Sequence, residues 1–456
     1  MRKVTVIIPN YNGIRFLEDC FAALEGQTFR DFDVIVVDNG SSDGSVEWLR
    51  GYAKAGAVAD GGMTVADSGK TAADGSETAT AGEKTGTDGN GIGDGSETVA
   101  DGGKASLASR TTLLALQENT GFSAAVNLGI RSTDAPYVVL LNNDTKADPH
   151  YLAELVKAMD GEVALHIRPT DKVAQHVAGR AGAADPAAER TGAAGNKGEG
   201  PGAADPAAER TGAAGNKGEG PAAAGNMGVD SAAGRRGGRI FSVSPMMLSM
   251  ARPDVIDDAG DMYSIFGWAF QRGVGQPQSR FEKPCGVFSA CAGAAIYRRA
   301  VFEEIGYFDE MHFAYLEDID IGWRARRAGY ENRYCPTARV CHVGSGTSGS
   351  KYNAFKVRLA SRNLVYLNWK NMPLLQLAVN APFLLVGLAV KALFYGRIGF
   401  FGAFLAGLGE GLLTLGKCKK APLTPASALR AISIEFMLIW GGALYVYEFV
   451  RRRVKI

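Results

Sequence analysis

Short apolar runs alternate with amphipathic stretches along the first third of the chain. Four runs of β-branched and aliphatic residues have the pattern of strands buried on both faces: 4–9, 33–38, 112–117 and 137–142. Apolar residues at helical spacing predict helices between and after them: 13–26, around 46–49, near 121–131 and 148–159. Asp148 is expected to cap the last of these helices, with Pro149 in its first turn. This alternation predicts an α/β fold with a mostly parallel, Rossmann-like sheet flanked by helices.

The loops that follow parallel strands meet at one edge of the sheet, where ligands bind. Loops beginning at Pro9, Asp38 and Asn142 are therefore expected to converge on one crevice. Residues 240–342 are more mixed, with strand-like segments at 240–246 and 286–297 and a helix that begins near Glu317.

Two stretches, about 51–110 and 161–238, interrupt this pattern. The second contains the same 20-residue sequence twice, at 182–201 and 202–221. A repeat without Leu, Ile, Val or Phe has no face to bury against its neighbour, which argues against a solenoid. Both stretches are predicted to be disordered insertions in a single domain that spans 1–370.

The C-terminal part is strongly hydrophobic. Residues 373–395 carry one charge, Lys391, and are long enough to cross a hydrocarbon core of roughly 30 Å. The segment 399–416 is weaker because it contains Glu410, and 431–450 contains two glutamates and precedes RRRVK. Two crossings, or a helical hairpin plus an interfacial helix, fit the positive-inside tendency better than three. Buried helices of a soluble domain remain the alternative.

Composition narrows the functional classes. With 49 Lys plus Arg against 48 Asp plus Glu, no global positive field favours nucleic-acid binding. The six cysteines form no CxxC pair, so neither a zinc site nor a disulfide scaffold is favoured. The first residues lack the apolar core of a signal peptide. We therefore expect a catalytic part on the cytoplasmic face of a membrane, with residues 371–456 as the membrane-associated region.

Polar residues at the ends of the predicted strands are candidates for ligand binding. Asp144 offers a carboxylate to a hard cation such as Mg²⁺ or Mn²⁺, and Asn142 and Asn143 can hydrogen-bond to a sugar. Asp38 can accept from a nucleobase or a ribose hydroxyl, and Tyr11 can stack on a base. An ordinary Asx turn at Asp144, an Asn-Gly turn after Asp38 and a buried tyrosine remain open as alternatives.

The segment EDIDIGWRARRAG, at 317–329, raises a second question of chemistry. Asp318 lies in the first turn of the predicted helix, where the helix dipole is expected to lower its pKa and keep it ionised. An ionised, partly desolvated carboxylate can act as a general base. Asp320 is expected to pair with Arg324, four residues later.

The other side chains of this helix are given structural roles. Ile319 and Trp323 share a face and are expected to pack. Arg326 and Arg327 are expected to be solvated, and Gly329 to end the helix.

Seven segments together resemble the ordered motifs of family-two glycosyltransferases with the GT-A fold, in particular the bacterial rhamnosyltransferase-like branch that builds cell-surface polysaccharides. They are IIPNYN, VVDNGSSDGS, ENTGFSAAVNLGI, LLNNDT, GAAIYRRAVFEEIGYFDE, YLEDIDIGWRARRAGY and HVGSGTSG. The resemblance covers roughly residues 3–50, 111–160 and 240–370.

This resemblance implies a donor site. Tyr11 matches the aromatic residue that stacks on the donor base, and Asp38 the acid that contacts the base or ribose. LLNNDT takes the place of the DxD motif, with Asp144 as the metal-binding acid and Asn142 in place of the first Asp. His342 matches a residue that contacts the metal or the diphosphate. The remaining donor-side assignments are Pro9, Asn119, Gly121, Asn127, Asn143 and Arg362, the last in an Arg-Asn pair with Asn363.

The resemblance also implies an acceptor side and a mechanism. Asp318 matches the general base of the ED motif, preceded by Glu317, and Gly293 and Trp323 are assigned to the acceptor side. The implied reaction is one displacement with inversion at the anomeric carbon, in which Mg²⁺ or Mn²⁺ at Asp144 neutralises the departing nucleoside diphosphate. The implied partners are a dTDP- or UDP-sugar, rhamnose among the candidate sugars, and a saccharide or polyprenyl-diphosphate-linked acceptor at a membrane, with no nucleic acid.

Other functional classes fit less well. A dehydrogenase would need GxGxxG after the first strand, and that pattern is missing. A sugar-nucleotide pyrophosphorylase would need a Gly-rich, Arg-containing N-terminal loop, which is also missing. A catalytically silent, membrane-bound nucleotide-sugar-binding scaffold of a polysaccharide assembly complex remains the alternative.

Overall fold

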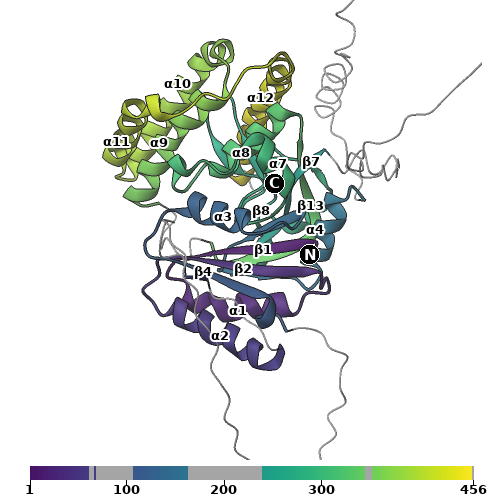
Figure 1. Ribbon diagram of the computed structural model, residues 1–456. Coiled ribbons are helices and arrows are strands. Elements are labelled where there is room, and N and C mark those ends of the chain that lie inside the picture. Colours follow the sequence, from purple (N-terminus) through teal and green to yellow (C-terminus); the bar gives the residue numbers. More distant parts are fainter. Residues whose placement is uncertain (61–65, 68–105, 163–238, 345–351, 454–456) are drawn as a thin grey trace, which may run out of the picture.

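The computed structural model describes residues 1–60, 66–67, 106–162, 239–344 and 352–453 (Figure 1). Most of the two predicted insertions lies outside these ranges. At the edges of the first insertion, helix α2 (Ser45–Asp60) continues past residue 51, and a short helical turn, η1 (Ala108–Arg110), precedes the next strand. Regular structure therefore extends into both ends of the segment that the sequence marks as an insertion.

The first half of the sheet is parallel, as predicted. Strands β1 (Val4–Asn10), β2 (Phe32–Asn39), β4 (Thr111–Leu116) and β5 (Tyr137–Leu141) lie in the order β5-β1-β2-β4, with the short β3 (Ala66–Asp67) beside β4. The β1–β2 register pairs Asn10 with Asp38. The carboxyl ends of these two strands are therefore level.

The second half makes the sheet mixed. Strand β12 (Ala294–Arg298) runs antiparallel to both β5 and β7 (Ile240–Ser249), and β13 (Glu331–His342) is parallel to β7. Strands β6 (Thr145–Ala147), β8 (Arg252–Asp258) and β11 (Cys285–Gly286) pair antiparallel at its margins, and β9 (Asp261–Tyr263) and β10 (Ala269–Gln271) form a separate hairpin. Within the strand-like segment 286–297, only residue 286, in β11, and residues 294–297, in β12, lie in strands.

Helices cover both faces of the sheet (Figure 1). One apolar cluster joins it to α1 (Ile14–Glu25), α2 and α4 (Tyr151–Met159), and a second joins it to α3 (Phe122–Arg131), α7 (Arg299–Ile305) and α8 (Glu317–Ala328). The predicted cap of α4 was wrong. Asp148 accepts a hydrogen bond from the His150 amide in a turn that precedes the helix, and His150 is the cap.

Helices α9 (Ala354–Asn371), α10 (Leu374–Arg397), α11 (Phe401–Leu413) and α12 (Pro425–Arg453) gather beside α8 (Figure 1). A third apolar cluster connects them to the sheet through Trp323, Leu364 and Leu438. Among the described residues, α10 and α12 are long and apolar enough to cross a membrane, and α11 is shorter.

Candidate active site

The ends of β1 and β2 and the loop after β5 are joined by one asparagine. Asn10 Nδ2 donates to Asp38 Oδ2 (2.7 Å), and Asn143 Nδ2 donates to Asn10 Oδ1 (2.6 Å). Asp38 is completely buried, whereas Tyr11 is 37% exposed. The three loops therefore converge as expected. Asn10 was overlooked in the sequence, although it follows Pro9 at the end of an apolar run.

Asp144 is paired with His342 at this edge. The β6–β13 pairing places His342 beside Thr145, and His342 Nε2 lies 3.3 Å from Asp144 Oδ1. The other ring nitrogen, Nδ1, lies 2.7 Å from Asp257 Oδ2. Burial lowers the pKa of His342, but the hydrogen bonds to both carboxylates outweigh it and raise the pKa to about 10.

The chemistry of this donor set fits a divalent cation. Asp144 supplies a carboxylate oxygen and His342 an imidazole nitrogen, and Mn²⁺ accepts both. Asp257 holds the far nitrogen of the ring, which is the usual arrangement around a metal-binding histidine. Imidazole binds metals in its neutral form, so binding would release the proton from Nε2.

The proposed base lies at the start of α8, after a loop with unusual backbone. Phe313, Tyr315 and Leu316 all have positive φ (60°, 73° and 68°). Asp318 Oδ1 accepts from the Ile319 amide (2.7 Å). Such left-handed conformations cost free energy in residues other than glycine, so surrounding contacts must impose them.

The predicted low pKa of Asp318 was wrong. Burial raises its pKa above the ordinary value, and hydrogen bonds from Asp261 and from backbone amides offset only part of this. Burial and the neighbouring Asp318 also raise the pKa of Glu317 to about 8. Desolvation therefore outweighs the favourable helix dipole at both positions.

A short route connects Asp318 with Asp144. The Ala292 amide contacts the Asp318 carboxylate, and the next carbonyl, of Gly293, accepts from the Asn142 amide (2.8 Å). Asn142 is two residues before Asp144. A Cβ added at Gly293 would lie 3.1 Å from Asn142 Nδ2, so these two segments approach closely.

A second route runs through β8. Asp257 holds His342, and the adjacent Asp258 is completely buried. Burial raises the pKa of Asp258 to about 7, with further contributions from Asp257 and Asp318. Both routes place the Asp144–His342 pair and Asp318 in one neighbourhood.

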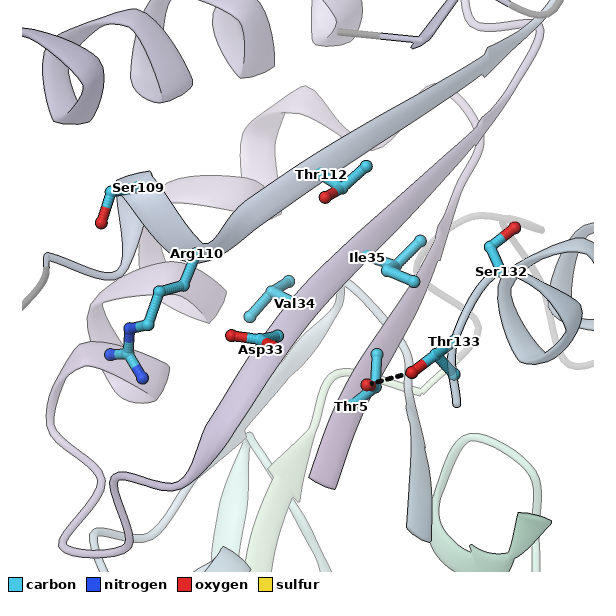
Figure 2. A pocket seen from close by; sticks show the side chains of 9 residues that line it. All are labelled: Thr5, Asp33, Val34, Ile35, Ser109, Arg110, Thr112, Ser132 and Thr133. Atoms are coloured by element: carbon cyan, nitrogen blue, oxygen red, sulfur yellow. Dashed lines mark hydrogen bonds between the residues drawn. The ribbon is translucent and has the colours of Figure 1, made fainter. Parts of the chain in front are cut away.

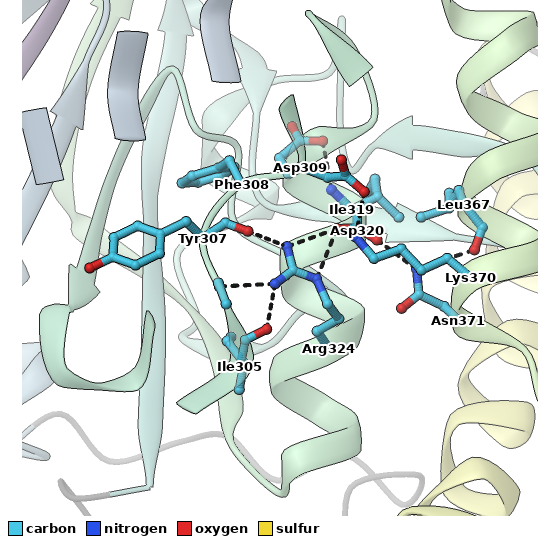
Figure 3. Close-up of polar contacts among 12 residues, drawn as sticks. Ile305, Tyr307, Phe308, Asp309, Ile319, Asp320, Arg324, Leu367, Lys370 and Asn371 are labelled. Carbon is cyan, nitrogen blue, oxygen red and sulfur yellow. Dashed lines mark hydrogen bonds and ion pairs between the residues drawn. The ribbon is translucent and has the colours of Figure 1, made fainter. Parts of the chain in front are cut away.

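The predicted Asp320–Arg324 ion pair is present, at 2.8 Å (Figure 3). Asp320 also accepts from Lys370 (2.9 Å) and Asn371 (2.7 Å) of α9. Burial raises the pKa of Asp320, but Arg324 and Lys370 lower it more, so the carboxylate stays ionised. This acid fastens α8 to α9.

The structure contradicts some of the other predictions for α8 and confirms one. Arg327 is 6% exposed and donates to the Pro422 carbonyl (2.7 Å), and Arg326 donates to the Phe288 carbonyl (2.9 Å), so the predicted solvation of both was wrong. Trp323 is completely buried against Tyr263 and Phe288, which makes it a packing residue and not an acceptor-side surface. Gly329 ends the helix with φ of 98°, as predicted.

Three residues assigned to the donor side fasten loops instead. Asn119 Oδ1 accepts from Asn39 Nδ2 (3.0 Å) and from the Gly121 amide (2.9 Å). Gly121 has φ of 90°, and a Cβ there would lie 2.6 Å from the Phe313 ring. Asn127 exchanges hydrogen bonds with the backbone of Phe308 (2.8 and 3.0 Å). The contacts of Gly121 and Asn127 hold the loop that precedes α8, and those of Asn119 join the turn before α3 to the end of β2.

The Arg-Asn pair of α9 has the same function. Arg362 donates to the carbonyls of Met311 and His312 and pairs with Glu410, and Asn363 donates to three carbonyls of the same loop. The guanidinium is therefore engaged with protein groups, in contrast to the expected contact with a diphosphate.

A separate pocket of about 310 Å³ lies at the opposite, amino-terminal end of β1, β2 and β4 (Figure 2). Thr5, Asp33, Arg110 and Thr133 contribute to its walls. It shares no lining residue with the site described above.

Comparison with known proteins identifies the N-terminal region. The model of the family described as "Glycosyl transferase family 2" matches residues 5–70 and 88–181. The chain carries a family 2 glycosyltransferase domain. The matched range contains Asp38 and Asp144, whereas His342 and Asp318 lie beyond it.

Among individual relatives of this family 2 domain, an N-acetylglucosaminyl-diphospho-decaprenol L-rhamnosyltransferase of Mycobacterium tuberculosis is 30% identical over 118 residues. The match covers 25% of this chain and 36% of the relative, so the chain spans only about a third of the relative's length.

Two solved structures show low similarity. A mannosyltransferase of Pyrobaculum calidifontis, in complex with GDP-Man and Mn²⁺, has a TM-score of 0.40 at 14% identity, over 100% of this chain and 88% of that one. Residues 1–349 of S. aureus TarS, in complex with UDP-GlcNAc, have a TM-score of 0.44 at 13% identity, over 96% and 90%. The strand order of this chain, and not these scores, therefore defines its fold.

Proposed function

We propose that the chain is an inverting glycosyltransferase that moves a sugar from a nucleoside-diphosphate donor to an acceptor hydroxyl. The observation that carries the proposal is the connection of Asp144 and His342 to Asp318 through the 292–293 segment. A single displacement needs groups that stabilise the leaving diphosphate and a group that accepts the acceptor's proton. These residues offer both functions in one neighbourhood.

On the donor side, Asp144 and His342 would hold the divalent cation. When bound, such a cation neutralises the negative charge of a departing diphosphate, an effect worth several kcal/mol. Asp38 is completely buried and accepts from Asn10 and from the Ser41 amide, so it would hold the loops that frame the base and ribose. The exposed ring of Tyr11 is available to stack on the base.

On the acceptor side, Asp318 would take the proton of the attacking hydroxyl. The acceptor oxygen then bonds to the anomeric carbon from the face opposite the diphosphate, which inverts the configuration. A carboxylate whose pKa is raised by burial is a stronger base than an exposed one, and the gain from a positioned base is roughly 10²–10⁴-fold.

The relative of M. tuberculosis motivates the identity of the substrates. We propose that L-rhamnose is transferred to a saccharide carried on a polyprenyl diphosphate, at the cytoplasmic face of a membrane. Helix α10 has 24 residues, roughly 36 Å at about 1.5 Å per residue. This exceeds a hydrocarbon core of about 30 Å. Exposed Leu375, Leu385 and Leu393 along α10 suit contact with lipid. An anchored enzyme would meet a lipid-linked acceptor at the membrane surface.

Transfer by the detergent-purified protein tests the proposal. The donors are dTDP- and UDP-sugars, including dTDP-L-rhamnose, and the acceptor is a polyprenyl-diphosphate N-acetylglucosamine, with and without Mn²⁺ or Mg²⁺. We expect metal-dependent release of nucleoside diphosphate and a product of inverted configuration by NMR. Asp318→Asn should lose transfer and keep donor binding. Donor binding without transfer in the unmutated protein would favour the alternative, a catalytically silent nucleotide-sugar-binding scaffold. Undiminished transfer by Asp318→Asn would refute the base assignment.

A further inference from the structure

The hairpin after β8 places a second buried acid against the proposed base. Asp261, the first residue of β9, is 6% exposed, and its carboxyl group makes a side-chain hydrogen bond with that of Asp318. Two carboxylates contain no donor, so this contact requires a proton on one of them. Asp261 Oδ2 has no other donor among the described residues.

Backbone contacts fix both acids to the same residue. Asp261 and Ser289 exchange two backbone hydrogen bonds (3.0 and 3.1 Å), and Ser289 Oγ donates to the Asp318 carbonyl (2.5 Å). A Cβ added at Gly322 of α8 would lie 2.2 Å from Ser289 Oγ, so this close approach of α8 depends on glycine. The meeting of the two acids is therefore determined by the fold.

Among the described residues, the titratable groups that act most strongly on Asp261, or on which it acts, are acids. They come from β8, α8, the segment before β12, and β12 itself: Asp258, Glu317, Asp318, Cys291 and Tyr297. Burial raises the pKa of Asp261 well above its ordinary value, and Asp258 and Asp318 raise it further. The hydrogen bond with Asp261 lowers the pKa of Asp318, although burial keeps that pKa above its ordinary value. Because this hydrogen bond raises the pKa of Asp261 and lowers that of Asp318, we assign the shared proton to Asp261 and the negative charge to Asp318.

We propose that Asp261 is a positioning residue, whose carboxylic acid donates a hydrogen bond to Asp318 and orients that carboxylate toward the acceptor hydroxyl. The inference rests on the proposed function. In the transfer step the hydroxyl proton moves to Asp318, and the acceptor oxygen bonds to the anomeric carbon. The bond from that carbon to the diphosphate breaks, and its electron pair leaves with the nucleoside diphosphate. Asp261 keeps its own proton throughout.

Two substitutions separate positioning from packing. Asp261→Asn keeps a hydrogen-bond donor of the same size, and Asp261→Ala removes it. We expect Asp261→Ala to lower kcat by roughly 10–100-fold with the donor KM unchanged, because a misplaced group loses about that much. Asp261→Asn should keep kcat within about threefold, in line with its retained donor. Asp254→Asn, at an exposed position of β8, is the control.

The pH profile provides a readout that packing alone would not change. In the unmutated enzyme, activity should fall on the alkaline side when Asp261 loses its proton and two carboxylates repel each other. Asp261→Asn cannot ionise, so the contribution of Asp261 to this alkaline limb should disappear and the limb should change in position or steepness. An identical alkaline limb in Asp261→Asn, or full kcat in Asp261→Ala, overturns the inference. If Asp261→Ala does not fold, the pH profile of Asp261→Asn decides between a positioning role and a packing role for Asp261.

An infrared measurement separates this inference from the proposed function. At neutral pH the unmutated protein should show the carbonyl band of a protonated carboxyl group that Asp261→Asn lacks, with or without sugar transfer. Absence of that difference refutes the shared proton. Absence of sugar transfer by the unmutated protein refutes the proposed function, and undiminished transfer by Asp318→Asn refutes the base assignment. Neither outcome changes the infrared result.

Discussion

Asp144 and Asp257 lie on opposite sides of one imidazole ring. His342 Nε2 faces Asp144 Oδ1 at 3.3 Å, and His342 Nδ1 faces Asp257 Oδ2 at 2.7 Å. The strand β8 thus supplies the acid that orients a ring at the end of β13. A cation held by Asp144 and His342 would depend on an acid that does not itself touch it.

Replacement of Asp257 should therefore weaken cation binding. We expect Asp257→Ala to reduce Mn²⁺ affinity about 10–100-fold, because groups that orient a metal-binding histidine have effects of this size. Calorimetric titration with Mn²⁺ measures the affinity directly, and transfer should recover at higher Mn²⁺. Asp254→Ala, at an exposed position in the same strand, is the matched control. Equal Mn²⁺ affinity in the two variants would contradict the role of Asp257.

The parallel strands could be predicted closely from the sequence. The runs 4–9, 33–38, 112–117 and 137–142 end within one residue of the observed strands. Each is a continuous apolar segment buried on both faces, so its boundaries coincide with a change from apolar to polar residues. The convergence of loops at the carboxyl ends followed from the parallel arrangement alone.

The burial of α8 could not be predicted in the same way. Its sequence reads as a charged, solvated helix, yet Asp320, Arg324 and Arg327 are buried. Their charges are compensated by Lys370 and by carbonyl groups from distant segments, as Figure 3 shows for Asp320 and Arg324. Composition records the charges but not the partners that tertiary packing provides. The acids of β8 and β9 were overlooked for the same reason.

The buried Glu317 should make stability depend on pH. Burial and the neighbouring Asp318 raise its pKa to about 8, from an ordinary value of 4.5. Between these values the folded protein holds a proton that the unfolded chain has released, so stability falls as pH rises and levels off above about 8. Glu317→Gln keeps the shape and removes this titration. The free energy of unfolding of this variant relative to the unmutated protein should rise with pH, by at most about 1.4 kcal/mol per pH unit.

Denaturant unfolding between about pH 5 and pH 8 measures this difference. Glu18→Gln, at an exposed position of α1, is the control. A difference between Glu317→Gln and the unmutated protein that does not change with pH would show that the Glu317 carboxyl group titrates normally.

Asn363 imposes the unusual backbone before α8. Its Nδ2 donates to the carbonyls of His312 (2.9 Å), Ala314 (2.9 Å) and Tyr315 (2.8 Å). Asn363→Asp places an acceptor where three carbonyl oxygens converge, so the loop should lose its conformation and displace Asp318. We expect kcat to fall roughly 10–100-fold and stability to fall by about 1–3 kcal/mol. Steady-state kinetics and thermal melting measure the two effects. An unchanged kcat in a folded Asn363→Asp variant would show that the loop does not position the base.

The β9–β10 hairpin that carries Asp261 is wedged between α10 and α12. The Ile265 amide donates to the Leu438 carbonyl of α12 (2.9 Å), and Trp268 Nε1 donates to the Gly387 carbonyl of α10 (3.1 Å). A Cβ added at Gly387 would lie 1.9 Å from the carbonyl oxygen of Phe266. The packing of the proposed membrane helices against this hairpin therefore helps to fix the position of the acids near Asp318.

Gly387→Ala should separate the hairpin from α10, because the clash involves backbone that cannot rotate away. We expect a lower melting temperature in detergent and a lower kcat. Gly396→Ala is a matched control in the same helix, since no atom lies within 4 Å of its added Cβ. An exposed Gly→Ala change in a helix stabilises by about 1 kcal/mol at most. Gly387→Ala should therefore lower both the melting temperature and the transfer rate. Gly396→Ala should lower neither. If Gly387→Ala melts and transfers sugar like Gly396→Ala, the hairpin does not couple these helices to the site.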